Sequence, residues 1–211
     1  MKRVCYLLLV VALLATDFSS FAQTSQRPHL RRHWTETETE TLWRTRYTNC
    51  DYGYYVLLES GVIGHGTHSP SPNHGFFVAL PDVGKTSFAS ANDEERIVWV
   101  DASYGTSDDQ SLVGAASEED QITTEASGHS RVVERKSTKL AGLQAIRSTA
   151  EYASPKGAVI DEAVIAVRSG IRYTISLHTT QRDRSVDEEQ FKKILNGFRL
   201  LKLPRGECSN G

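Results

Sequence analysis

Two consecutive β-strand patterns separated by only two residues constrain the fold of this chain most. Residues 159–168 and 171–179 are rich in β-branched and aromatic side chains, and Ser169-Gly170 between them is a link of the two-residue hairpin type. Apolar residues alternate with polar ones in the second segment, where they are Ile171, Tyr173, Ile175 and Leu177. The hairpin therefore has one apolar face, which another element has to cover.

A closing amphipathic helix is expected to cover that face. Ser185-Val-Asp-Glu188 matches a capping box, the pattern that begins many helices. Four apolar residues follow with the spacing i, i+3, i+4 and i+7: Phe191, Ile194, Leu195 and Phe198. This spacing places them on one side of a helix that lies on the antiparallel sheet.

The remaining pattern predicts more strands and one more helix. Strand-like runs occur at residues 54–58, 76–80, 96–100, 131–136 and 143–152, and residues 108–126 form a weakly amphipathic candidate helix. We therefore expect a single α+β domain over residues 46–205, in which helices flank an antiparallel sheet, and a short tail over 206–211. About 160 residues suffice for an adequate core.

The N-terminal residues have the pattern of an export signal. A basic start is followed by an apolar run and then by Ser20-Phe21-Ala22, a small-x-small cleavage site, so residues 1–22 are predicted to be a signal peptide. The run is shorter than the roughly 20 residues of a spanning helix, and we expect a periplasmic or extracellular protein without membrane insertion. The Thr/Glu alternation within residues 23–45 indicates a polar linker or a loosely held edge segment.

Charge and cysteine content narrow the choice of partners and compartment. The chain has 24 Lys and Arg against 26 Asp and Glu, and removal of residues 1–22 leaves 22 against 25. This balance gives no electrostatic reason to expect nucleic acid as a partner. Cys50 and Cys208 remain in the mature chain, and in an oxidising compartment we expect them to form a disulfide, the alternative being two free thiols.

Several short segments resemble the PsbP-like superfamily, which includes the extrinsic photosystem II subunit, its relatives and a Ran-binding import factor. The segments are Tyr52-Gly-Tyr54, Leu140-Ala-Gly-Leu143-Gln-Ala145, Gly170-Ile-Arg-Tyr173-Thr-Ile-Ser-Leu177 and the stretch from Asp187 to Phe198, in which Asn196-Gly197 departs from the usual residues. The resemblance rests on packing residues and implies a PsbP-like α/β/α sandwich, usually a non-catalytic binding or accessory module.

The string Gly64-His-Gly-Thr-His68 is typical of the catalytic histidine region of subtilisin-like proteases. A triad of Asp51, His65 and Ser107 has the chain order of that family. However, Ser69-Pro70-Ser71-Pro72 follows where the family has a buried helix, and Asp108-Asp109 follows the serine where the family continues its nucleophile helix. The protease interpretation is therefore rejected.

The same loop contains a possible metal site. His65, His68 and His74 lie within ten residues, and three imidazoles plus water make an open zinc site. The competing interpretation is a structural turn in which glycines supply unusual backbone angles and prolines stiffen the loop.

Other polar groups are assigned structural or surface roles. The acidic runs at 118–120 and 187–189 are predicted to be solvated helix faces or first-turn partners of the helix dipole, and His129 and His178 to be ordinary surface or hydrogen-bonded histidines.

We therefore expect an exported, non-catalytic binding or accessory module without a cofactor, with another exported or envelope protein as its partner. The candidate binding residues are those of the loop: His65, Thr67, His68, Asn73 and His74. The alternative is a metal-binding protein or metal-dependent hydrolase that holds zinc with His65, His68 and His74.

Overall fold

The computed structural model describes residues 41–66, 73–80, 83, 96–105, 111–155 and 157–202. Along the chain the elements are β1 (Thr41–Trp43), β2 (Arg46–Asn49), β3 (Tyr54–Leu57), β4 (Gly64–Gly66), β5 (Phe76–Ala79), β6 (Ile97–Tyr104), α1 (Leu112–Ser127), β7 (Arg131–Leu140), β8 (Leu143–Ser154), β9 (Gly157–Arg168), β10 (Ile171–Thr180), α2 (Arg184–Gly197) and β11 (Phe198–Leu200). The predicted signal peptide, most of the predicted linker and the tail lie outside these residues.

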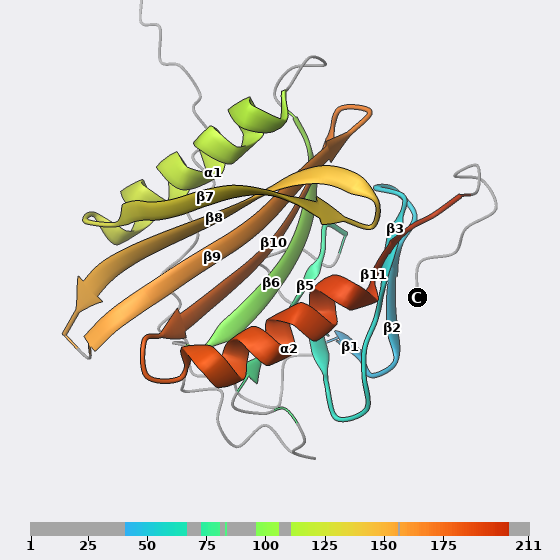
Figure 1. The fold of residues 1–211 in the computed structure, drawn as a ribbon. Coiled ribbons are helices and arrows are strands. Elements are labelled where there is room, and N and C mark those ends of the chain that lie inside the picture. Colours follow the sequence, from blue (N-terminus) through green and yellow to red (C-terminus); the bar gives the residue numbers. More distant parts are fainter. Residues whose placement is uncertain are drawn as a thin grey trace, which may run out of the picture.

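Most of the described chain is antiparallel sheet, with two helices (Figure 1). Eight strands form one sheet in the order β1, β4, β5, β6, β10, β9, β8, β7, and a second sheet has the order β11, β3, β2. β1 lies at the edge of the large sheet and pairs with β4. The expected α+β class is thus present in a form dominated by the sheet.

Two-residue turns join β7 to β8 and β9 to β10, forming two long hairpins in the large sheet. Ser169 and Gly170 have φ angles of 52° and 74°, and Ala141 and Gly142 have 47° and 87°. Positive φ at both central residues is the geometry of a two-residue turn that matches the twist of the flanking strands. The predicted Ser169-Gly170 hairpin is confirmed, and Ile171 pairs with Arg168.

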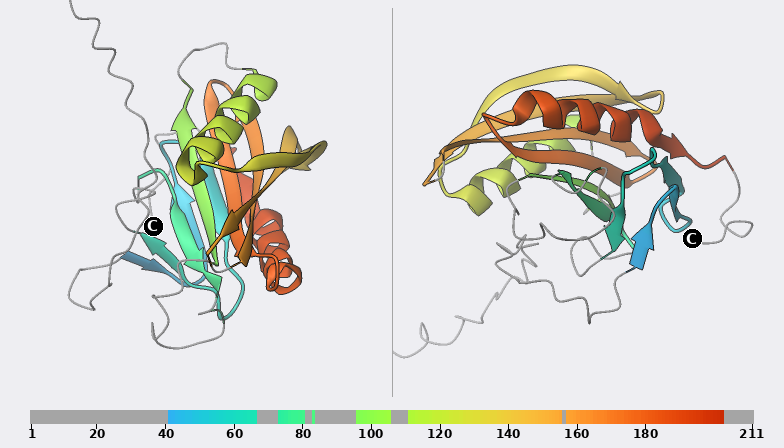
Figure 2. Two further views of the ribbon diagram at one scale, coloured as in Figure 1. Left: turned by 90° about the vertical axis from the view of Figure 1, so that its left-hand side faces the viewer. Right: turned by 90° about the horizontal axis from the view of Figure 1, so that it is seen from below.

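Each helix covers part of one face of the large sheet (Figure 2). Phe191 and Ile194 of α2 belong to the main core, together with alternate residues of β6 and β10 such as Val100 and Tyr173. Ala115 and Ala116 of α1 pack on Ile146 and Ile165, which point to the other side. The face predicted to be polar is therefore partly covered, and Thr174 and Ser176 on it are buried.

Three aromatic rings join the two sheets. Tyr54 of β3 stacks on Phe198 of β11 with ring centroids 5.1 Å apart, and Tyr173 of β10 meets both rings edge-on. The sequence pattern placed Phe198 in the closing helix, but it begins β11 and pairs with Val56. Gly197 makes this exit possible, because a Cβ there would lie 2.2 Å from the carbonyl oxygen of Leu57.

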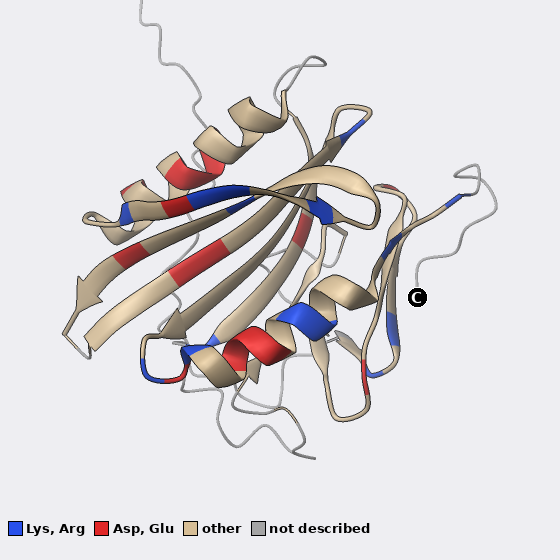
Figure 3. Cartoon of the chain, viewed as in Figure 1, with Lys and Arg blue, Asp and Glu red and all other residues tan. Residues whose placement is uncertain are grey.

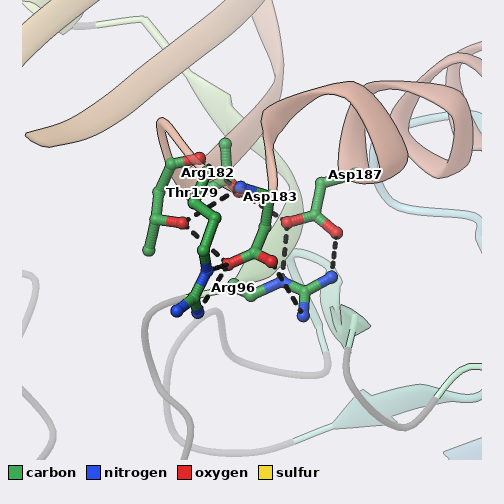
Figure 4. A network of polar contacts seen from close by, with 6 residues as sticks. Arg96, Thr179, Arg182, Asp183 and Asp187 are labelled. Carbon is green, nitrogen blue, oxygen red and sulfur yellow. Dashed lines mark hydrogen bonds and ion pairs between the residues drawn. The ribbon is translucent and has the colours of Figure 1, made fainter.

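The beginning of α2 differs from the predicted capping box. The N-cap is Asp183 rather than Ser185, and Asp187 is buried. Arg96 donates two hydrogen bonds to the Asp187 carboxylate at 2.8 and 2.6 Å, and the Thr179 hydroxyl donates a third at 2.5 Å (Figure 4). Asp187 lies in the first turn of α2, as one of the two predicted alternatives requires, but the other alternative, a solvated face, is wrong at this residue. Its contacts connect α2 to β10 and to the start of β6.

We expect Asp187→Ala to lower the free energy of unfolding by about 3 kcal/mol, because Arg96 loses its two hydrogen bonds to Asp187 and keeps only the more distant Asp183, 3.9 Å away. Glu189→Ala, at an exposed position on the same helix, is the control and should change it by less than about 0.5 kcal/mol. Urea unfolding of both variants checks the difference. Equal effects would show that the Asp187 network contributes little.

Candidate functional site

The segment from His65 to His74, which we call the histidine loop, begins within the large sheet. His65 lies in β4 opposite Phe77 of β5, is 3% exposed, and stacks on the Phe77 ring with centroids 5.0 Å apart and an interplanar angle of 17°. Its ring is therefore packed between strands as a structural side chain.

The second end is held by tyrosines and an asparagine. The Asn49 amide donates to the Asn73 carbonyl at 2.7 Å, and the Tyr54 hydroxyl donates to the His74 carbonyl at 2.7 Å. The His74 Nε2 lies 3.3 Å from the Tyr52 hydroxyl. Gly75 follows, and a Cβ there would lie 1.8 Å from the Val100 carbonyl oxygen, so only glycine allows this approach to β6.

The middle of the loop, with Thr67 and His68, lies outside the described residues. Among those that are described, no group of three or more His, Cys, Asp or Glu side chains could hold a metal ion. The structure thus places two of the three candidate ligands, and the three-histidine site stays a hypothesis. Cys50 is buried after β2, but Cys208 lies outside the described part, so the disulfide also stays a prediction.

We expect protein purified without an affinity tag to contain much less than one zinc per chain. A metal would have to displace the packing of His65 on Phe77 and the contact of His74 with Tyr52. Elemental analysis of wild type and of His68→Ala tests this. Stoichiometric zinc that is lost in His68→Ala would establish the metal hypothesis instead.

The residues around His74 form a buried tyrosine cluster. Tyr173 donates its hydroxyl to the Tyr52 carbonyl at 2.8 Å, and Asn49 donates to the Tyr47 hydroxyl at 2.8 Å. Burial raises the pKa of Tyr47 and Tyr52, and raises that of Tyr54 well above its ordinary value. The cluster therefore favours neutral phenols and anchors the loop.

The raised pKa values predict loss of stability in alkali. The unfolded tyrosines ionise near pH 10, whereas the folded state resists ionisation, so the free energy of unfolding should be steady below about pH 9 and fall above about pH 10. Urea unfolding between pH 8 and 11 measures the fall. Tyr54→Phe should be less stable at neutral pH and show a shallower fall, and an equally steep fall would exclude Tyr54 as its source.

A histidine and an aspartate, neither of them predicted to be functional, form a pair on the α1 side of the sheet. His178 Nδ1 lies 2.6 Å from Asp161 Oδ1, and the imidazole also contacts the rings of Trp99 and Tyr152. The two-residue turn at 169–170 already implies this pairing, because counting back along both strands places His178 opposite Asp161. An imidazole held by a carboxylate has a defined orientation.

A second buried carboxylate lies on the α2 side. Glu162 of β9 is 1% exposed, forms an ion pair with Arg147 of β8, and lies 4.0 Å from Arg184 at the start of α2. Arg184 also donates to Glu188 at 2.8 Å. These charges connect the helix to the sheet, and periodicity alone gives no sign of them.

Acidic residues of α1 make similar connections. Asp120 accepts a hydrogen bond from Ser148 at 2.6 Å and forms an ion pair with Arg135, and Glu119 is 3% exposed. The prediction of a solvated face at 118–120 is therefore wrong at these two positions.

The outer face of the small sheet carries an aromatic and basic surface, in which the tyrosine is partly buried and the other side chains are exposed. It consists of Arg46, Tyr55, Leu57 and Arg199, which we call the Tyr55 surface. The Arg46 guanidinium lies 4.1 Å from the centre of the Tyr55 ring, and Arg199 is opposite Tyr55 in register. Leu57 is 45% exposed.

These elements define a class of protein in which one helix packs on each side of an antiparallel sheet. The chain has the PsbP-like fold: it is similar to the cyanobacterial PsbP protein CyanoP of Synechocystis sp. PCC 6803, with a TM-score of 0.54 and 15% sequence identity. The likeness covers 80% of this chain and 98% of that one. At this identity it concerns the fold.

Two further structures are similar at lower scores. The Ran-binding protein Mog1p of Saccharomyces cerevisiae has a TM-score of 0.48 and 11% identity, over 76% of this chain and 97% of that one. LpqN, involved in cell envelope biogenesis of Mycobacterium tuberculosis, has 0.37 and 14%, over 81% and 88%.

No protein-family model and no curated protein matches the sequence. In the described part of the chain, neither helix is long and apolar enough to cross a membrane.

Proposed function

We propose that this protein is an exported, non-catalytic binding or accessory module that binds another exported or envelope protein. The observation that carries the proposal is the Tyr55 surface. Tyrosine and arginine are the residue types that most often dominate the binding energy of protein interfaces. Here they lie beside a leucine whose side chain is 45% exposed.

The Tyr55 surface is rigid, which favours binding. Its strands turn Tyr47, Tyr54 and Phe198 inward, where each side chain is at most 1% exposed. The Tyr55 ring has few rotatable bonds and contacts Arg46. A partner would therefore meet side chains that lose little conformational freedom on binding.

Four carboxylates that lie between helices and strands or between neighbouring strands support a non-catalytic role. Asp120, Glu162 and Asp187 each contact an arginine, and Asp161 contacts His178. Such pairs hold helices and strands together, whereas a pair of catalytic acids faces a substrate cleft. The loop residues Thr67, His68 and Asn73 remain a second candidate contact region, and export depends on the predicted signal peptide.

Gentle crosslinking in the native envelope or culture fluid tests the proposal. Wild type is expected to give a crosslinked complex with one exported protein, and Leu57→Asp should lose it because a carboxylate replaces the apolar contact. Val133→Asp, at a strand position that is 40% exposed, is the matched control and should keep the complex. The mature chain should begin at Gln23.

Thermal unfolding of both variants shows whether the fold is retained. A wild-type protein that remains alone under crosslinking, or a Leu57→Asp variant that keeps the complex, would contradict the proposal. Turnover of a small substrate by the isolated chain would contradict its non-catalytic part.

A further inference from the structure

A hollow of about 600 Å³ lies where β11 ends beside two turns of the large sheet. It is lined by Ala141 of the β7–β8 turn, Arg168 at the end of β9, and the C-terminal residues Arg199, Leu200, Leu201 and Lys202. Its volume is within the range of ligand sites, which is about 300–1,000 Å³.

The charge of this hollow is all of one sign. Three of its six lining residues are cations and none is acidic. Within the described ranges, Arg168, Arg199 and Lys202 form no ion pair, whereas Arg96, Arg147 and Arg172 each lie beside a carboxylate. In Figure 3, the coloured part of the chain from β11 to residue 202 carries blue segments and no red ones.

Arg199 is held in place by the end of α2. Its guanidinium donates to the carbonyl oxygens of Asn196 and Phe198, the latter at 2.8 Å. These bonds use one nitrogen, Nη1, and leave other donors of the planar fork for a ligand. The whole chain has a net charge of −2, yet these three cations lie around one hollow. Like charges repel one another, and a bound anion would offset that repulsion.

We propose that this hollow binds an acidic peptide segment of the partner, with carboxylates on Arg168, Arg199 and Lys202 and an apolar side chain against the exposed parts of Leu200 and Leu201, both of which are partly buried. This inference rests on the proposed binding function. Arginine binds carboxylates through paired N–H donors, and leucine side chains give an apolar lining that a free inorganic anion does not use. Arg199 also belongs to the Tyr55 surface, so one partner can cover both.

Fluorescence anisotropy with a labelled peptide of sequence Leu-Glu-Glu-Leu-Glu-Glu tests the site. Wild type is expected to bind the peptide, more weakly as salt rises from 50 to 300 mM. The double variant Arg168→Glu/Lys202→Glu should bind at least about tenfold more weakly, because two attractive contacts become repulsive. This variant leaves Arg199 on its two carbonyl groups.

Arg44→Glu is the matched control. Arg44 is an exposed cation that precedes β2. The opposite end of β2, at Asn49, is the end nearer to the hollow, because Asn49 pairs with Tyr54 and Tyr54 pairs with Leu200. The five residue steps from Arg44 to Asn49 span roughly 15 Å. This variant should bind the peptide as wild type does.

Two further probes separate the possible sources of the anion. A Leu-Gln-Gln-Leu-Gln-Gln peptide should not bind, and inorganic phosphate should not displace the acidic peptide at equal charge concentration. Displacement by phosphate would replace the peptide proposal with a free-anion site. Equal binding by the double variant and wild type, or no binding at 50 mM salt, would overturn the hollow as a site. The crosslinking experiment with Leu57→Asp would still test the proposed binding function independently of this hollow.

Discussion

The contact among Tyr54, Tyr173 and Phe198 is the interaction on which the rest of the structure depends. These rings come from β3, β10 and β11, so they join the small sheet to the large one and fix the point where the chain leaves α2. Aromatic rings bury large areas and prefer stacked or edge-on geometries, which sets distance and orientation together. With the inner face so constrained, Tyr55 and Arg199 have to point outward.

The part of the fold that the sequence predicts is the part whose signal is local. The β9–β10 hairpin follows from alternation and from two turn residues, and its register places His178 opposite Asp161 without further information. Asp187 shows the limit of such patterns. Its sequence neighbours have the composition of an ordinary first helical turn, and its burial comes from Arg96, which is 91 residues away in the chain. No local pattern contains that partner.

The short strands illustrate the same limit in another way. β11 has three residues and exists because Gly197 lets the chain pass close to Leu57, so its strand character comes from its neighbour. The histidine loop attracted attention because its residue types are chemically rich. The described structure instead packs His65 on Phe77 and holds His74 among tyrosines, so residue type alone is a weak guide to reactivity.

The distribution of charge gives the clearest physical distinction between scaffold and surface. Buried arginines and carboxylates are matched across elements, as at Arg147 with Glu162 and Arg96 with Asp187, because an unmatched buried charge would be strongly destabilising. Arg168, Arg199 and Lys202, which form no ion pair within the described ranges, lie instead around the exposed hollow at the end of β11. Arg199 is opposite Tyr55 in register. In the free protein, water solvates these exposed cations, and a carboxylate of a partner can replace that water. A fold that pairs its buried charges but leaves three cations together around one hollow presents the physical pattern of a binding site.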